Sequence, residues 1–167
     1  MTETRDDGAM NDHGVPEAEK VRLAAAWAAA HYFVTIGRQE WLFHVGQSTV
    51  DIERQLPADE YLLITAWNPP PGEASRQANL AADERLRARL TAEGYVYHPA
   101  IGCDGEGGAT EHGWLVLNAP IERADTLARE FRQGGILYWQ RGEPVRLRMQ
   151  WPCPAGFQDG GYIDWAG

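Results

Sequence analysis

The sequence has few cysteines and no long apolar run, and both absences limit what the protein can be. Cys103 and Cys153 are its 2 cysteines, and neither belongs to a C-x-x-C pair, so we expect no disulfide framework and no thiolate metal site. No apolar stretch approaches roughly 20 residues, the length that crosses a bilayer. The segment before Pro16 lacks the basic and apolar regions of a secretory signal. These absences predict a soluble, cytoplasmic protein without a membrane partner.

Positive charge is also scarce. Lys and Arg number 15 against 24 Asp and Glu, which gives this acidic chain a formal net charge of -9. Such a field repels nucleic-acid backbones and anionic membrane surfaces. We therefore regard nucleic acid as a disfavoured partner, although a local arginine patch can override the average field.

The common sequence signatures of catalysis are missing. There is no G-x-S-x-G nucleophile elbow, no G-x-x-x-x-G-K phosphate loop and no G-x-G-x-x-G dinucleotide motif. The sequence therefore predicts no serine-hydrolase triad on such an elbow and no nucleotide cofactor, and we expect the protein to work without cofactors.

What is present is enough apolar material for one folded domain. Hydrophobic residues make up 44% of the 167 residues, and 7 are Trp, so a chain of this length can bury a real core. We divide it into a disordered lead-in over 1–16, a single α+β domain over 17–151, and an irregular tail over 152–167 that is rich in Gly, Pro and aromatic residues.

The order of the expected elements predicts the fold class. The alanine-rich stretch from Glu17 to about Tyr32 favours a helix, HYFVTIG and EWLFHVG favour a β-hairpin, and Ser48–Leu56 favours at most one helical turn. From Tyr61 the expected order is strand, helix, strand, strand, helix, strand. This is the β-α-β-β-α-β order of a ferredoxin-like sandwich, here with an N-terminal helix and hairpin and an added C-terminal strand.

The segments behind that order are as follows. The four strands are YLLITAW, YVYHPAI, WLVLNA and GILYWQ, the helices run from Ser75 to about Glu93 and from Ile121 to Arg132, and VRLRMQ is the added arm. The glycine-rich stretch GCDGEGGATEHG is expected to be a long loop between the second and third strands.

A first candidate site lies at the start of the helix over 75–93. Its apolar stripe turns polar at Asn79 and Ser75, and the free N–H groups of a helix N-terminus attract anionic or carbonyl-bearing ligands. Asn68, just past the preceding strand, is expected beside them. The competing interpretation is structural: Ser75 caps its own helix, Asn79 bonds the proline-rich loop, and Asn68 forms an Asx-turn.

Two further candidates are weaker. One combines thiol, carboxylate and imidazole groups, which suit a divalent metal or a cysteine nucleophile, at His98, Cys103, Asp104, Glu106, Glu111 and His112. Their spacing matches no known metal pattern, so we predict no metal. The other is a sheet face with Arg146 and Arg148 near Tyr138 and Trp139, which could stack single-stranded nucleic acid. Because of the net charge, we favour salt bridges to acidic residues there.

Several motifs together resemble a known family. T-A-W-N-P, the Ser75 and Asn79 pair, Gly102, Glu111, and the F-x-Q that ends at Gln133 resemble the bacterial domain of unknown function 3293 family over about 61–149. The resemblance implies a small cytosolic bacterial protein without an assigned activity. It places weight on five polar positions, which are Asn68, Ser75, Asn79, Glu111 and Gln133. The chain departs from the family pattern after Glu111, where His and Gly replace the usual Pro and Ser.

Three functions follow from these patterns. The first is a small-ligand-binding or regulatory module, which could be a homodimer, in which Asn68, Ser75, Asn79 and Gln133 hold an unknown small polar ligand at the start of the helix over 75–93. The second is an enzyme in which Glu111, with its pKa raised by partial burial, acts as general acid or base. The third is single-stranded nucleic-acid binding through the face with Arg146 and Arg148.

Overall fold

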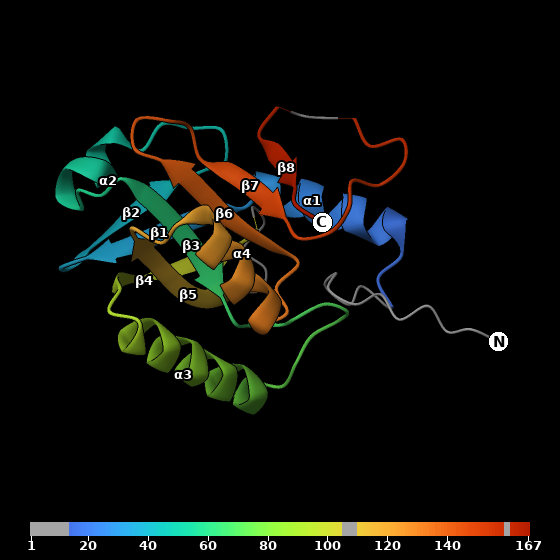
Figure 1. Cartoon of the computed structure of the whole chain (residues 1–167), viewed down its shortest axis with the longest axis horizontal. Coiled ribbons are helices and arrows are strands. Elements are labelled where there is room, and N and C mark those ends of the chain that lie inside the picture. The colour runs from blue at the N-terminus through green and yellow to red at the C-terminus, as the bar shows by residue number, and fades with distance from the viewer. Residues whose placement is uncertain (1–13, 105–109, 159–160) are drawn as a thin grey trace.

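The computed structural model describes residues 14–104, 110–158 and 161–167, and within them four helices and eight strands form a mixed α+β fold (Figure 1). The prediction of an α+β fold is thereby confirmed. In chain order the elements are α1 (Glu17–Ala29), β1 (His31–Ile36), β2 (Gln39–Phe43), α2 (Val50–Gln55), β3 (Glu60–Thr65), α3 (Arg76–Ala92), β4 (Val96–Cys103), β5 (Thr110–Leu117), α4 (Ile121–Glu130), β6 (Gly135–Gln140), β7 (Arg146–Met149) and β8 (Ile163–Trp165).

All described strands belong to one sheet, in the order β2-β1-β4-β5-β3-β6-β7-β8. The neighbouring strands are antiparallel, except that β8 runs parallel to β7. The predicted order of six elements, from β3 to β6, is present, and its four strands lie side by side in the middle of the sheet. The predicted N-terminal hairpin, β1 and β2, extends the sheet next to β4.

The central strand β3 is buried on both faces of the sheet. Leu62 and Ile64 pack with α3 and α4, whereas Tyr61 and Leu63 belong to the core on the side of α1 and α2. All four are at most 7% exposed. This explains the continuously apolar sequence, because a strand covered on both sides has no polar face. In Figure 1, α4 lies in front of this part of the sheet.

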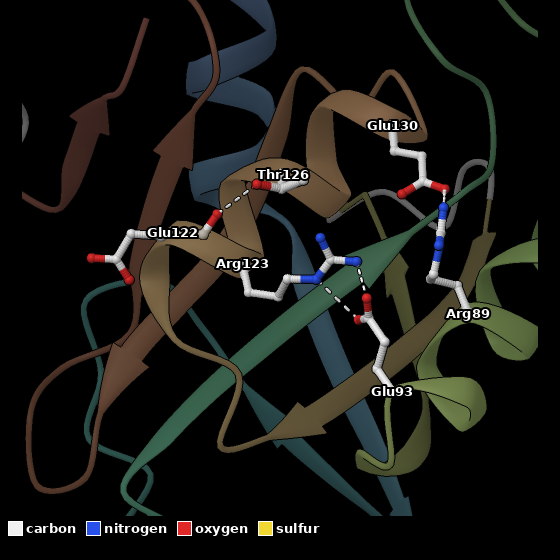
Figure 2. Close-up of polar contacts among 6 residues, drawn as sticks. All are labelled: Arg89, Glu93, Glu122, Arg123, Thr126 and Glu130. Atoms are coloured by element: carbon white, nitrogen blue, oxygen red, sulfur yellow. Dashed lines mark hydrogen bonds and ion pairs between the residues drawn. The ribbon is translucent and has the colours of Figure 1, made fainter.

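Local signals set the bounds of the middle helix. The Ser75 hydroxyl accepts a hydrogen bond from the Ala78 N–H (3.1 Å), which is the predicted N-cap. Gly94, with φ +78°, follows the end of the helix in the left-handed conformation that glycine adopts without strain. Ion pairs join the last half of α3 to α4: Arg89 with Glu130 and Arg123 with Glu93 (Figure 2).

The predicted long loop between the second and third strands is wrong in its extent. Gly102 pairs with Glu111 and Cys103 with Thr110, so β4 and β5 continue into the glycine-rich stretch. Gly102 is suited to this position, because a Cβ there would lie 3.1 Å from the Tyr32 ring. The consequence for the site is that Glu111 belongs to a strand. The middle of the expected loop, 105–109, lies outside the described residues.

The two ends of the chain differ in part from the predicted disordered lead-in and irregular tail. The tail, predicted to be irregular, forms β8, in which Ile163 pairs with Leu147, and Trp165 packs against the core. At the other end, 1–13 of the expected lead-in lie outside the described residues, while Val15 is buried in the core. No described helix is both long and apolar enough to span a membrane.

A buried ion pair connects β7 to α4. Asp125, 8% exposed, accepts two hydrogen bonds from the Arg148 guanidinium, each 2.8 Å long, and one from the Gln150 amide at 2.9 Å. Burial raises the pKa of the Asp125 carboxyl, but these hydrogen bonds outweigh burial and leave that pKa below its usual value. The carboxylate is therefore part of the folded state near neutral pH.

We predict that Asp125→Ala lowers the free energy of unfolding by about 2–3 kcal/mol, because it leaves the Arg148 charge without its partner at a poorly hydrated position. Arg123→Ala, which breaks a more exposed pair, is the matched comparison and should cost no more than about 1 kcal/mol. Urea unfolding measures both. Equal losses in the two variants would contradict the structural role of the Asp125 pair.

Candidate functional site

A cavity of about 310 Å³ lies between α1 and the sheet. It is located where β3 and β4 end and where β1, β5 and β6 begin, so five strands meet at this end of the sheet. Its walls are mainly apolar: Leu23 and Trp27 come from α1, and Leu63 and Leu137 from the sheet. A ligand entering here would bury apolar surface on both sides.

Small residues create the space. Ala26 on α1 and Ala30, which directly follows this helix, line the cavity, where larger side chains would fill the gap. On the sheet, Gly135 allows the Trp27 ring to approach closely, since a Cβ at this position would lie 3.0 Å from that ring. The cavity is therefore bounded by the Trp27 and Tyr32 rings, which pack against Gly135 and Gly102, and by Ala26 on α1.

The polar groups of the cavity are few. Glu111, partly buried on β5, accepts a hydrogen bond from the Asn68 side-chain amide (3.1 Å). Gln133, 5% exposed, also lines the cavity, and its amide N–H group donates to the Trp67 carbonyl at 3.3 Å. The exposed residues Arg22, Glu73 and Asp104 mark its mouth.

Glu111 is a titratable group of the cavity whose pKa is shifted by its surroundings. Burial raises the pKa of its carboxyl, the hydrogen bond from Asn68 acts in the opposite direction, and the negative charge of Glu73 raises it further. The net effect is a raised pKa. The carboxyl in turn affects Tyr32, whose pKa is raised by burial and then by the charge of Glu111.

Two asparagines join the end of β3 to the first turn of α3. The Asn79 side-chain oxygen accepts from the Asn68 backbone N–H, and the Asn79 amide donates to the Asn68 side-chain oxygen, both at 2.9 Å. That oxygen also accepts from the Ala74 N–H at 3.0 Å. Asn68 has φ +49°, a left-handed conformation that asparagine tolerates better than most residues. The pair fixes the intervening loop and aims the remaining Asn68 donor at Glu111.

The structure brings together most of the residues that the sequence singled out. Asn68, Asn79 and Glu111 form one hydrogen-bonded chain, and Gln133 lines the same cavity as Glu111. Ser75 is exposed and caps its helix. Neither Ser75 nor Asn79 lines the cavity, so the hollow lies on the α1 side of the sheet and not at the start of α3.

Tyr32, Trp27 and the small residues of α1 are the parts of the site that sequence reasoning missed. Their role depends on α1 lying over this end of the sheet, which is a long-range arrangement. The sequence held one usable signal, the clustering of alanine on a single helix, but alanine is also simply the best helix former.

The other candidate sites lose support in the described residues. No group of three or more described His, Cys, Asp or Glu residues is placed to hold a metal ion, and Glu106 lies outside the described residues. The two arginines of the sheet face form the expected salt bridges, Arg146 with Asp164 (2.7 Å) and Arg148 with Asp125 (2.8 Å). Their charge is therefore already balanced.

Comparison with known proteins gives one match. Residues 64–136 match the family model described as Protein of unknown function (DUF3293). This segment of the chain is similar to the DUF3293 family. The resemblance inferred from the motifs is thereby confirmed, and the match runs from the end of β3 to the start of β6, so that it contains Asn68, Glu111 and Gln133 but not α1. Neither the curated proteins nor the solved structures include a match.

We predict that Asn79→Ala destabilises the protein by about 1–3 kcal/mol, because the Asn68 N–H loses its acceptor in a partly buried position. Since Asn68 and Asn79 bond each other, the double variant with Asn68→Gly should cost less than the sum of the single changes. Chemical unfolding of all three variants gives this coupling. Strict additivity would mean that the two amides do not act as a pair.

Glu111→Gln should make the protein more stable than wild type near neutral pH. A carboxyl whose pKa is higher folded than unfolded stabilises the fold when protonated, and this contribution is lost as pH rises from the ordinary glutamate range through the raised value. The introduced glutamine amide retains an acceptor for Asn68 and has no charge to bury. Melting temperatures of the two proteins over a pH series should therefore converge in acid and diverge as pH rises. A constant difference would contradict the raised pKa.

Proposed function

We propose that the protein is a small-ligand-binding module and that the ligand occupies the cavity between α1 and the sheet. The observation that carries this proposal is a partly buried carboxylate, Glu111, held by Asn68 at the wall of a mainly apolar hollow. Small-molecule sites are typically apolar clefts of roughly 300–1,000 Å³ with a few placed polar groups. The cavity lies at the lower end of that range, which suits a compact ligand.

A regulatory role is compatible with the arrangement of the walls. One wall is α1, which precedes the family-matched segment, and the other is the sheet, to which that segment contributes Gly102 and Glu111. A ligand between them would contact both and would stabilise their packing by mass action. We further infer a ferredoxin-like unit from β3 to β6, supported by the antiparallel order β4-β5-β3-β6 with α3 and α4 on one face. The cytoplasmic location and the homodimer stay predictions from sequence.

A second candidate function is general acid or base catalysis by Glu111. It is supported by the raised pKa of that carboxyl, since burial tunes carboxyl groups toward neutral pH in many enzymes. Turnover that is lost in Glu111→Gln while binding persists would separate this function from simple binding. The nucleic-acid hypothesis has no comparable support, because Arg146 and Arg148 are engaged in ion pairs.

Filling the cavity tests the binding function. Ala25 and Ala26 are neighbours on α1 and both are exposed, but only Ala26 lines the cavity. We predict that, in a thermal-shift panel of amines, alcohols, amino acids, nucleosides and carboxylic acids, at least one compound raises the melting temperature of wild type and Ala25→Trp but not of Ala26→Trp. A panel that shifts none of the three, or all three equally, would remove this cavity as the binding site.

A further inference from the structure

Two side chains of the cavity, Gln133 and Glu111, have acceptor oxygens that few donors in the wall reach. Gln133 donates its amide N–H group to the Trp67 and Phe131 carbonyls (3.3 and 3.4 Å), which fixes the orientation of the amide. No described residue donates a hydrogen bond to its oxygen. Glu111 receives one donor, from Asn68, for two carboxylate oxygens. At the mouth, Glu73 has no hydrogen bond or ion pair with a described residue, and its charge adds to that of Glu111.

The arginine among the lining residues is already paired with a neighbouring glutamate. Arg22 stands at the mouth, but its guanidinium bonds Glu19 (2.8 Å) one helical turn away and is exposed. Tyr32 directs its hydroxyl to the Trp27 carbonyl at 2.5 Å, so this donor is engaged as well. Partial burial of the Glu111 carboxylate carries a desolvation cost, which also raises the pKa of this carboxyl. A ligand that brings donors and positive charge would relieve this cost.

We propose that the cavity selects a primary ammonium group carried on a compact apolar body. The ammonium would lie between Glu111 and the Gln133 oxygen, because its three donors can satisfy two acceptors and one water or Glu73. The apolar part would pack between Trp27 and Leu63. The formal charge of -9 also favours the approach of cations. This inference rests on the proposed binding function and adds the chemical class of the ligand.

The main rival is a carboxylic acid ligand. A protonated Glu111 could donate a hydrogen bond to such a ligand, and the raised pKa of the group makes that form more abundant in mild acid. The two cases differ in their pH dependence. Ammonium binding requires the Glu111 carboxylate and strengthens as pH rises, whereas carboxylate binding requires the acid form and weakens.

Three probes that share a phenylethyl body separate these cases: 2-phenylethylamine, 2-phenylethanol and 3-phenylpropionate. We expect calorimetric titration of the full chain to show the amine binding about tenfold or more tightly than the alcohol, as a charge-assisted contact implies, with the propionate weakest. The amine affinity should rise from acidic to neutral pH. Glu111→Gln should reduce the amine to the affinity of the alcohol, while Glu84→Gln, an exposed change on α3, should leave it unchanged.

Each other outcome overturns the inference. Equal affinities for amine and alcohol, or stronger binding of the propionate in acid, would leave a ligand-binding cavity that does not select ammonium. The same holds if the amine binds Glu111→Gln as tightly as wild type. Absence of binding by all three probes also rejects the ammonium class, and the wider panel with Ala26→Trp then decides whether the binding function itself fails.

Discussion

Burial of β3 on both faces is the constraint on which the rest of the fold depends. A strand with apolar side chains on each side needs two separate layers, and here α3 and α4 supply one while α1 and α2 supply the other. The two layers are not equivalent. The α4 layer is closed by Leu127 and its neighbours and braced by ion pairs to α3 (Figure 2), whereas α1 meets the sheet partly through alanine and leaves a hollow.

The asparagine pair connects this packing to the site. The Asn68 backbone N–H and side-chain oxygen form the hydrogen bonds that hold the loop after β3. These bonds do not use the side-chain nitrogen of Asn68. That nitrogen reaches Glu111 on β5. The structural and functional interpretations of the asparagines are thus parts of one network: the bonds that shape the loop also orient the carboxyl at the cavity wall.

Local patterns in the sequence predicted what local physics controls. The Ser75 cap, the hairpin of β1 and β2, and the helices α3 and α4 all appear in the structure. The start of β5 and the strand β8 were missed, because both are defined by pairing with a distant strand and not by their own composition. The cavity was missed for a similar reason, since its shape requires α1 over glycine positions on β4 and β6.

The division of the site between two parts of the chain has a physical consequence. Glu111, Asn68 and Gln133 lie within the family-matched segment, whereas Trp27 and Ala26 come from a helix before it. The charge and hydrogen-bonding capacity of the cavity therefore belong to the matched segment, and much of its apolar wall belongs to α1. Substitutions on α1 can alter the size of the accepted ligand without touching the carboxyl that would recognise its polar group.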